Sequence, residues 1–126
     1  MSKPLAQVLL ERYWDEASNQ AQYELVRELC ADPIVRHDPG KAPTRLSHDE
    51  QIERLRFGVE QMGVVIDRVL VHADDTLATS VWNLVMTKAG DKRLSGIEVF
   101  RVADGRLAEC WNAPYGDGHW DEPLDA

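Results

Sequence analysis

Hydrophobic residues recur every three or four positions through the first half of the chain, a spacing typical of helices that bury one face. We expect a first helix over residues 4–17, with Ser2 as its N-cap. A second helix is expected over residues 20–30, ending before Asp32-Pro33 because proline disfavours helical geometry in the preceding residue. The run Ser47-His48-Asp49-Glu50 is a capping-box pattern for a third helix, which Gly63 would end.

The second half of the chain is rich in β-branched residues and predicts strands. Long strands are expected over residues 64–72 and 77–88, followed by a hairpin over 94–112, and a short extended segment is expected over 34–38. Helices followed by about four long antiparallel strands indicate an α+β fold, with three N-terminal helices packed on one face of a strongly bent, mostly antiparallel sheet.

The hairpin is centred on Ala103-Asp104-Gly105 and has two open registers. A two-residue turn at Asp104-Gly105 would set Glu98 opposite Trp111, whereas a three-residue loop ending at Gly105 would set Glu98 opposite Cys110. We favour the three-residue loop. Because side chains alternate between the faces of a sheet, one face would then carry Glu98, Phe100, Ala108, Cys110 and Asn112, and the other Ile97, Val99, Leu107, Glu109 and Trp111.

An apolar outer face of this kind would be exposed in a monomer, and such patches usually mark interfaces. We therefore expect a homodimer formed through the outer sheet face. A bent sheet closed by only three helices would also leave room for an apolar cavity on its inner face, suited to a small apolar molecule.

Composition and charge narrow the choice of partners. The chain has 126 residues, which we interpret as a single domain (residues 1–126) with a core over about 5–112 and an irregular acidic tail over 113–126. Its net charge of −8 disfavours nucleic acid and anionic membranes, both of which attract clustered Lys and Arg. No apolar run approaches the length of a bilayer span, and the N-terminus lacks a secretory apolar core, so we expect a cytoplasmic protein.

Neither cysteine nor histidine spacing indicates a metal site. Cys30 and Cys110 lie far apart in the sequence and fit two small buried side chains, and the four histidines show no paired spacing. We expect neither a metal nor a cofactor.

The helices-first order, together with Arg12-Tyr13, the segment from Asp32 to Gly40, and the segment from Phe100 to Asn112, resembles the nuclear transport factor 2-like superfamily. The resemblance covers about residues 5–112 and is greatest to the branch of SnoaL-like polyketide cyclases and ketosteroid isomerases. It implies a cone-shaped (cystatin-like) fold, a deep apolar pocket and commonly a dimer.

The ketosteroid isomerases supply the sharpest correspondence. Their oxyanion-donating tyrosine corresponds to Tyr13, and their aspartate base, which stands before a proline, corresponds to Asp38. Their second oxyanion donor, a carboxylic acid two residues before Phe-Arg, corresponds to Glu98, here one methylene longer than the family's aspartate. The SnoaL-like cyclases instead place an acid after the tryptophan of the last strand, where this chain has Asn112.

Each candidate also has a structural interpretation. Asp38-Pro39 is a common turn former, Glu98 would pair with Arg101 if it lay near a sheet edge, and Tyr13 on an apolar helix face is ordinary core. The residues expected to line the substrate pocket beside these three are Trp14, His37, Phe57, Trp82, Phe100, Cys110 and Asn112.

The pattern favours an isomerase-type enzyme that moves a proton on an apolar ketone. Asp38 would act as the base, and Tyr13 and protonated Glu98 would stabilise the enolate. The alternatives are a SnoaL-like cyclase or dehydratase, and a non-catalytic member that binds a small ligand or a partner.

Overall fold

The computed structural model describes residues 2–124, which form one layer of helices against one bent sheet. The helices are α1 (Leu5–Arg12), η1 (Tyr13–Ser18), η2 (Tyr23–Leu25), α2 (Val26–Leu29) and α3 (His48–Glu60). The strands are β1 (Cys30–His37), β2 (Thr44–Leu46), β3 (Val64–Ala73), β4 (Leu77–Met86), β5 (Lys92–Ala103) and β6 (Arg106–Tyr115). The predicted α+β class is confirmed.

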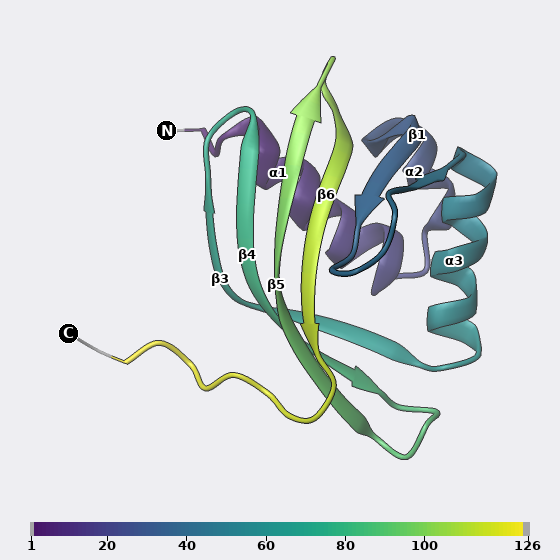
Figure 1. The fold of residues 1–126 in the computed structure, drawn as a ribbon, viewed down its shortest axis with the longest axis vertical. Coiled ribbons are helices and arrows are strands. Elements are labelled where there is room, and N and C mark those ends of the chain that lie inside the picture. Colours follow the sequence, from purple (N-terminus) through teal and green to yellow (C-terminus); the bar gives the residue numbers. More distant parts are fainter. Residues whose placement is uncertain (1, 125–126) are drawn as a thin grey trace.

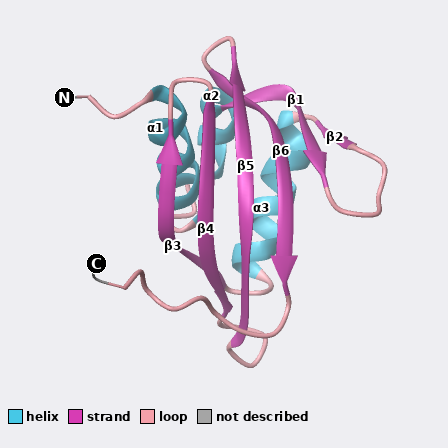
Figure 2. Cartoon of the chain, turned by 60° about the vertical axis from the view of Figure 1, so that its left-hand side comes forward, coloured by secondary structure: helices cyan, strands magenta, loops and turns pink. Residues whose placement is uncertain are grey.

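The sheet has the order β2-β1-β6-β5-β4-β3 and is antiparallel except where β1 runs parallel to β6. The helices lie on one face of the sheet, and β3 forms the edge strand beside β4 (Figure 2), beginning near the end of α3 (Figure 1). The inner face and the helices enclose the core, whose fully buried members include Leu10, Val26, Leu29, Phe100 and Leu107.

The first predicted helix is continuous, but it changes from α1 to the π-helical turn η1 at Tyr13. Its N-terminus differs from the prediction. Ser2 is not its cap; the amide of Leu5 instead donates to the carboxylate of Asp75 in the β3–β4 turn at 2.9 Å.

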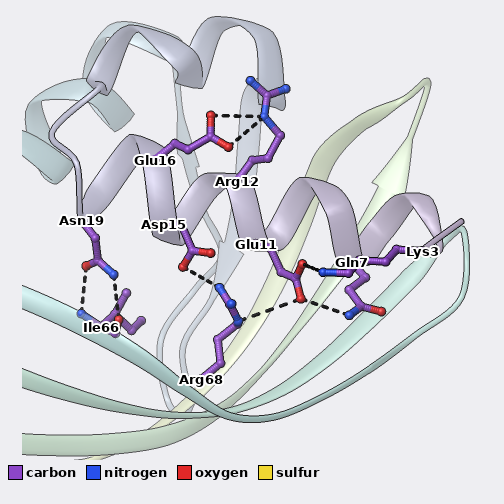
Figure 3. A network of polar contacts seen from close by, with 9 residues as sticks. All are labelled: Lys3, Gln7, Glu11, Arg12, Asp15, Glu16, Asn19, Ile66 and Arg68. Atoms are coloured by element: carbon purple, nitrogen blue, oxygen red, sulfur yellow. Dashed lines mark hydrogen bonds and ion pairs between the residues drawn. The ribbon is translucent and has the colours of Figure 1, made fainter.

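Polar contacts hold this helix against the edge strand β3 (Figure 3). Arg68 of β3 reaches the carboxylates of Asp15 at 2.5 Å and Glu11 at 4.0 Å. The side chain of Asn19 both donates to and accepts from the backbone of Ile66, at 2.8 and 3.0 Å. These contacts position the buried face of the helix over the sheet.

The second helix is shorter than predicted, because only residues 23–29 are helical and the chain is already extended at Cys30. The third helix agrees with the sequence pattern. Ser47 and Glu50 form the reciprocal capping box, and Gly63 follows the helix with a φ of +67°.

The hairpin combines features of both predicted registers. Asp104 and Gly105, with φ of 52° and 75°, form a two-residue turn, so the preferred three-residue loop is wrong. An extra residue at Ala108 then forms a bulge that shifts the pairing, and Glu98 lies opposite Asn112. The two-residue turn pairs Leu107 with Val102 and so places Leu107 on the buried inner face rather than the predicted outer one, and the bulge then returns Cys110 and Asn112 to the face of Glu98, as predicted.

The segment after β6 has no regular secondary structure but packs along the outer side of the sheet. Asn83 of β4 exchanges two hydrogen bonds with the backbone of Trp120, and the Trp120 indole donates to the carbonyl of Gly96 at 3.2 Å. His119 contacts the carbonyl of Leu84 at 2.9 Å. Figure 2 shows this tail crossing the lower part of the strands.

Candidate functional site

An inner cavity of about 140 Å³ lies between the helices and the concave face of the sheet. Six of the residues predicted for the site line it: Tyr13, Trp14, Trp82, Glu98, Phe100 and Asn112. The cavity is also lined by Ser18, Arg36, Arg54, Leu55, Val64, Ile66 and Leu84. Because engineered cavities of about 150 Å³ admit benzene, this volume suits a single ring.

Glu98 is the only carboxyl side chain on the wall of this cavity within residues 2–124. It is 6% exposed, and its Oε2 has no hydrogen-bond partner. Burial raises the pKa of Glu98 because the ionised form loses its hydration, while the nearby charge of Arg36 opposes the rise. A carboxyl group of this kind is suited to exchange protons with a ligand.

Arg36 completes the polar floor of the cavity and was not predicted from the sequence. Its Nη1 lies 3.8 Å from Glu98 Oε2 and 3.4 Å from the sulfur of Cys110, to which it donates. The parallel register of β1 and β6 places Arg36 beside Cys110. Alternation with the buried Ile34 was the one sequence signal that pointed Arg36 inward.

The predicted pocket residue Cys110 lies behind this floor rather than on the cavity wall. Its side chain is fully buried, and burial raises the pKa of its thiol to about 12. It therefore stays neutral and contacts Arg36 and Glu98 as part of their packing.

Other polar side chains line the same cavity as Glu98. Tyr13 is 3% exposed, and its hydroxyl oxygen accepts from the side-chain amide of Gln51, which leaves its own proton free to donate. Burial also raises the pKa of Tyr13, so the phenol remains protonated. The indole nitrogen of Trp82 and the amide oxygen of Asn112 have no partner in the described chain.

A groove of about 350 Å³ between α3 and the strands β3 and β4 adjoins the cavity. The groove and the cavity share five lining residues: Ser18, Arg54, Leu55, Val64 and Leu84. Its own walls are apolar and include Phe57, Val59, Met62 and Met86. Phe57 was predicted for the pocket itself, but the residue is 61% exposed and lines this groove, because its position on α3 points away from the cavity.

Asp38 and His37 do not line the inner cavity. Both border an open depression on the outer face of the sheet, and His37 stacks on Trp111 with ring centroids 5.0 Å apart. The prediction that His37 lines the pocket is therefore wrong, since it alternates with the inward-facing Arg36. Asp38 directly follows the end of β1, and its charge contributes to the raised pKa of Glu98.

The cavity therefore places one buried carboxyl group beside the donor groups of Tyr13, Arg36 and Trp82. Such an arrangement can accept a proton from a ligand and stabilise negative charge that develops on an oxygen. Among residues 2–124, no three side chains cluster in a way that would hold a metal ion, and no helix has the length and apolarity to span a bilayer.

The model of the SnoaL-like domain family matches residues 10–110. No protein of curated function matches the sequence significantly.

Several solved structures share the fold. A provisionally assigned polyketide cyclase from Acidithiobacillus ferrooxidans is 21% identical, with 90% of this chain and 91% of that chain covered and a TM-score of 0.75. A provisionally assigned ketosteroid isomerase from Kribbella flavida is 18% identical, with 96% and 84% covered and a TM-score of 0.71. RV0760c from Mycobacterium tuberculosis, solved with estradiol-17beta-hemisuccinate, is 12% identical, with 87% and 93% covered and a TM-score of 0.73.

Proposed function

This chain belongs to the SnoaL-like domain family, and from its cavity we propose that it is an acid–base enzyme that moves a proton on a small apolar ketone. The predicted nuclear transport factor 2-like fold and SnoaL-like family are confirmed by the family match and by the solved structures. The observation that carries the proposal is Glu98, a buried carboxyl group on the wall of a ring-sized cavity, with one oxygen that has no hydrogen-bond partner.

The proposed reaction is the migration of a double bond into conjugation with a ketone. Ionised Glu98 takes a proton from the carbon between the carbonyl and the double bond, and the electron pair of that C–H bond forms an enolate. The hydroxyl of Tyr13 and the indole N–H of Trp82 donate to the enolate oxygen. Glu98 then returns the proton to the far carbon of the former double bond, and the carbonyl re-forms.

These roles differ from those that the family resemblance implied. Asp38 was expected to be the base and Glu98 a neutral donor, but only Glu98 lies on the cavity wall. A carboxylate whose pKa is raised by burial is a stronger base than a hydrated one, and the charge of Arg36 at 3.8 Å keeps its ionised form accessible.

The shape of the site and the relatives both support a ketone with an apolar body. The inner cavity holds about one ring, and the adjoining groove offers apolar walls to the rest of the molecule. Two structures of the same fold are a provisionally assigned ketosteroid isomerase and a protein crystallised with a steroid derivative. The cyclase alternative lacks its acid, because that position is Asn112.

The test is the isomerisation of 3-cyclohexenone to its conjugated isomer, followed by ultraviolet absorbance. The reaction is run with wild type, Glu98→Gln and Asp38→Asn. Glu98→Gln keeps the side-chain volume and removes the base, so we expect kcat/KM to fall by about 100-fold or more. Asp38→Asn is the matched control and should lose less than about fivefold in kcat/KM, because it removes only a charge outside the cavity.

Full turnover by Glu98→Gln would overturn the assignment of the base. If Asp38→Asn alone lost turnover, Asp38 would be the base, as the family resemblance implied. If wild type converted neither 3-cyclohexenone nor a β,γ-unsaturated steroid ketone, the isomerase proposal would fail, and a family member that only binds small ligands would replace it.

A further inference from the structure

Arg54 is an arginine without a partner at the mouth of the cavity. It lies on α3 and borders both the inner cavity and the adjoining groove. In residues 2–124 its guanidinium forms no ion pair and no side-chain hydrogen bond. Among the arginines in the described helices, Arg54 is the one without an ion pair.

The other arginines of the helices are all engaged by carboxylates. Arg12 contacts Glu28 at 3.1 Å, Arg27 contacts Asp49 at 2.6 Å, and Arg56, two residues from Arg54, contacts Glu53 and Glu60. In a chain with a net charge of −8, acidic partners are abundant. An unpaired guanidinium beside a cavity is therefore available to a ligand.

The charge of Arg54 acts on the interior of the site as well as on solvent. It lowers the pKa of both Glu98 and Tyr13, opposing the effect of burial on each. A ligand carboxylate would not bind at the floor of the cavity beside Glu98, because the two carboxylates would repel each other. At the mouth, a negatively charged group of a ligand can pair with the guanidinium of Arg54 and keep part of its hydration.

We propose that Arg54 is a specificity-determining residue that binds a carboxylate, so that the substrate is an apolar oxo acid with its ketone inside the cavity and its carboxylate at the mouth. This inference deepens the proposed function and rests on the same site. Guanidinium groups bind carboxylates through charge-assisted, often paired hydrogen bonds, which a neutral amide of the same shape cannot match. The unpaired Trp82 indole N–H deeper in the cavity serves the ketone.

The test compares the binding of benzoate and benzamide by calorimetry at low ionic strength. The two probes share one ring and nearly one shape, and they differ in charge. We expect wild type to bind benzoate about tenfold more tightly than benzamide. Arg54→Gln should lose this preference, Arg54→Lys should keep part of it, and Arg56→Gln should keep it in full, because Arg56 is held by its own carboxylates.

Equal affinity of wild type for the two probes would overturn the inference, as would a preference that survives Arg54→Gln or that is equally lost in Arg56→Gln. Failure of both probes to bind at millimolar concentration would also overturn it, since the cavity has the volume of one ring. Binding requires no turnover, so these outcomes are separate from failure of the isomerase proposal.

Discussion

At the residue scale, Glu98 couples the proposed chemistry to the stability of the fold. Its side chain is buried and its pKa is raised, so the folded protein holds the Glu98 proton to a higher pH than the unfolded chain does. At a pH between the pKa of Glu98 in the unfolded chain and its pKa in the folded protein, the unfolded chain has lost this proton and the folded protein still holds it. The free energy of unfolding must therefore decrease as pH rises through that window.

We expect Glu98→Gln to remove this loss of stability. Glutamine has no proton to lose, so the melting temperature of the variant relative to wild type should be higher at about pH 8 than at about pH 4, which lies below the ordinary range for glutamate. Thermal unfolding at both values measures the difference. The opposite trend would mean that the attraction of Arg36 outweighs the burial of Glu98 and would contradict the raised pKa.

Single residues also show what the sequence could reveal about the site. Glu98 stood out as a lone carboxylate in an apolar strand, and the resemblance to the ketosteroid isomerases pointed to Tyr13. Arg36 and Arg54 were missed because an arginine in a strand or on a helix usually points to solvent. Their roles depend on partners that lie far away in the sequence, such as Cys110 for Arg36.

At the element scale, α3 supplies one wall of the cavity and is fixed at its start by the capping box. Ser47 accepts from the amide of Glu50 at 3.1 Å, and the Glu50 side chain accepts from the Ser47 amide at 3.0 Å. These bonds satisfy two backbone donors that the first turn would otherwise leave unpaired. Gln51, which contacts Tyr13, lies in the same turn.

Loss of this cap should weaken the whole domain. We expect Ser47→Ala to lower the free energy of unfolding by about 1 kcal/mol, measured by urea denaturation. Ser47→Asp is the control, because aspartate also accepts at an N-cap, and it should stay within about 0.5 kcal/mol of wild type. Equal stability of Ser47→Ala and wild type would show that the capping box contributes nothing net.

Local patterns predicted the elements better than their pairing. The capping box, Gly63 and the long strands β3, β4 and β5 agree with the sequence, because their signals lie within each segment. The parallel pairing of β1 with β6 joins residues more than seventy positions apart, which no local period encodes. The bulge at Ala108 inserts one unpaired residue that the alternating sequence pattern does not reveal, and it shifts the pairing so that Glu98 lies opposite Asn112.

At the scale of the whole molecule, the two faces of the sheet are covered to different extents. The helices cover the inner face, while the tail after β6 covers part of the outer face near Gly96 and Asn83. The outer face of β5 and β6 beyond the tail is left open, with Ile97 41% and Trp111 40% exposed. An apolar surface of this kind costs free energy in water unless another molecule covers it.

We propose that a second copy of this chain covers the patch, as expected from the sequence. Light scattering at micromolar concentration should then give twice the mass of one chain.

Trp111→Lys would place a charge in the buried interface and should give a monomer with an unchanged circular dichroism spectrum. Leu70→Lys, at an apolar site on the edge strand β3 that is 56% exposed, is the control and should remain dimeric. A monomeric wild type would contradict the dimer, and dissociation by both variants would place the interface elsewhere. Because Asp38 borders the same depression as Trp111, a dimer built on this patch would further bury Asp38, and dissociation should raise the exposure of Asp38 without opening the cavity that holds Glu98.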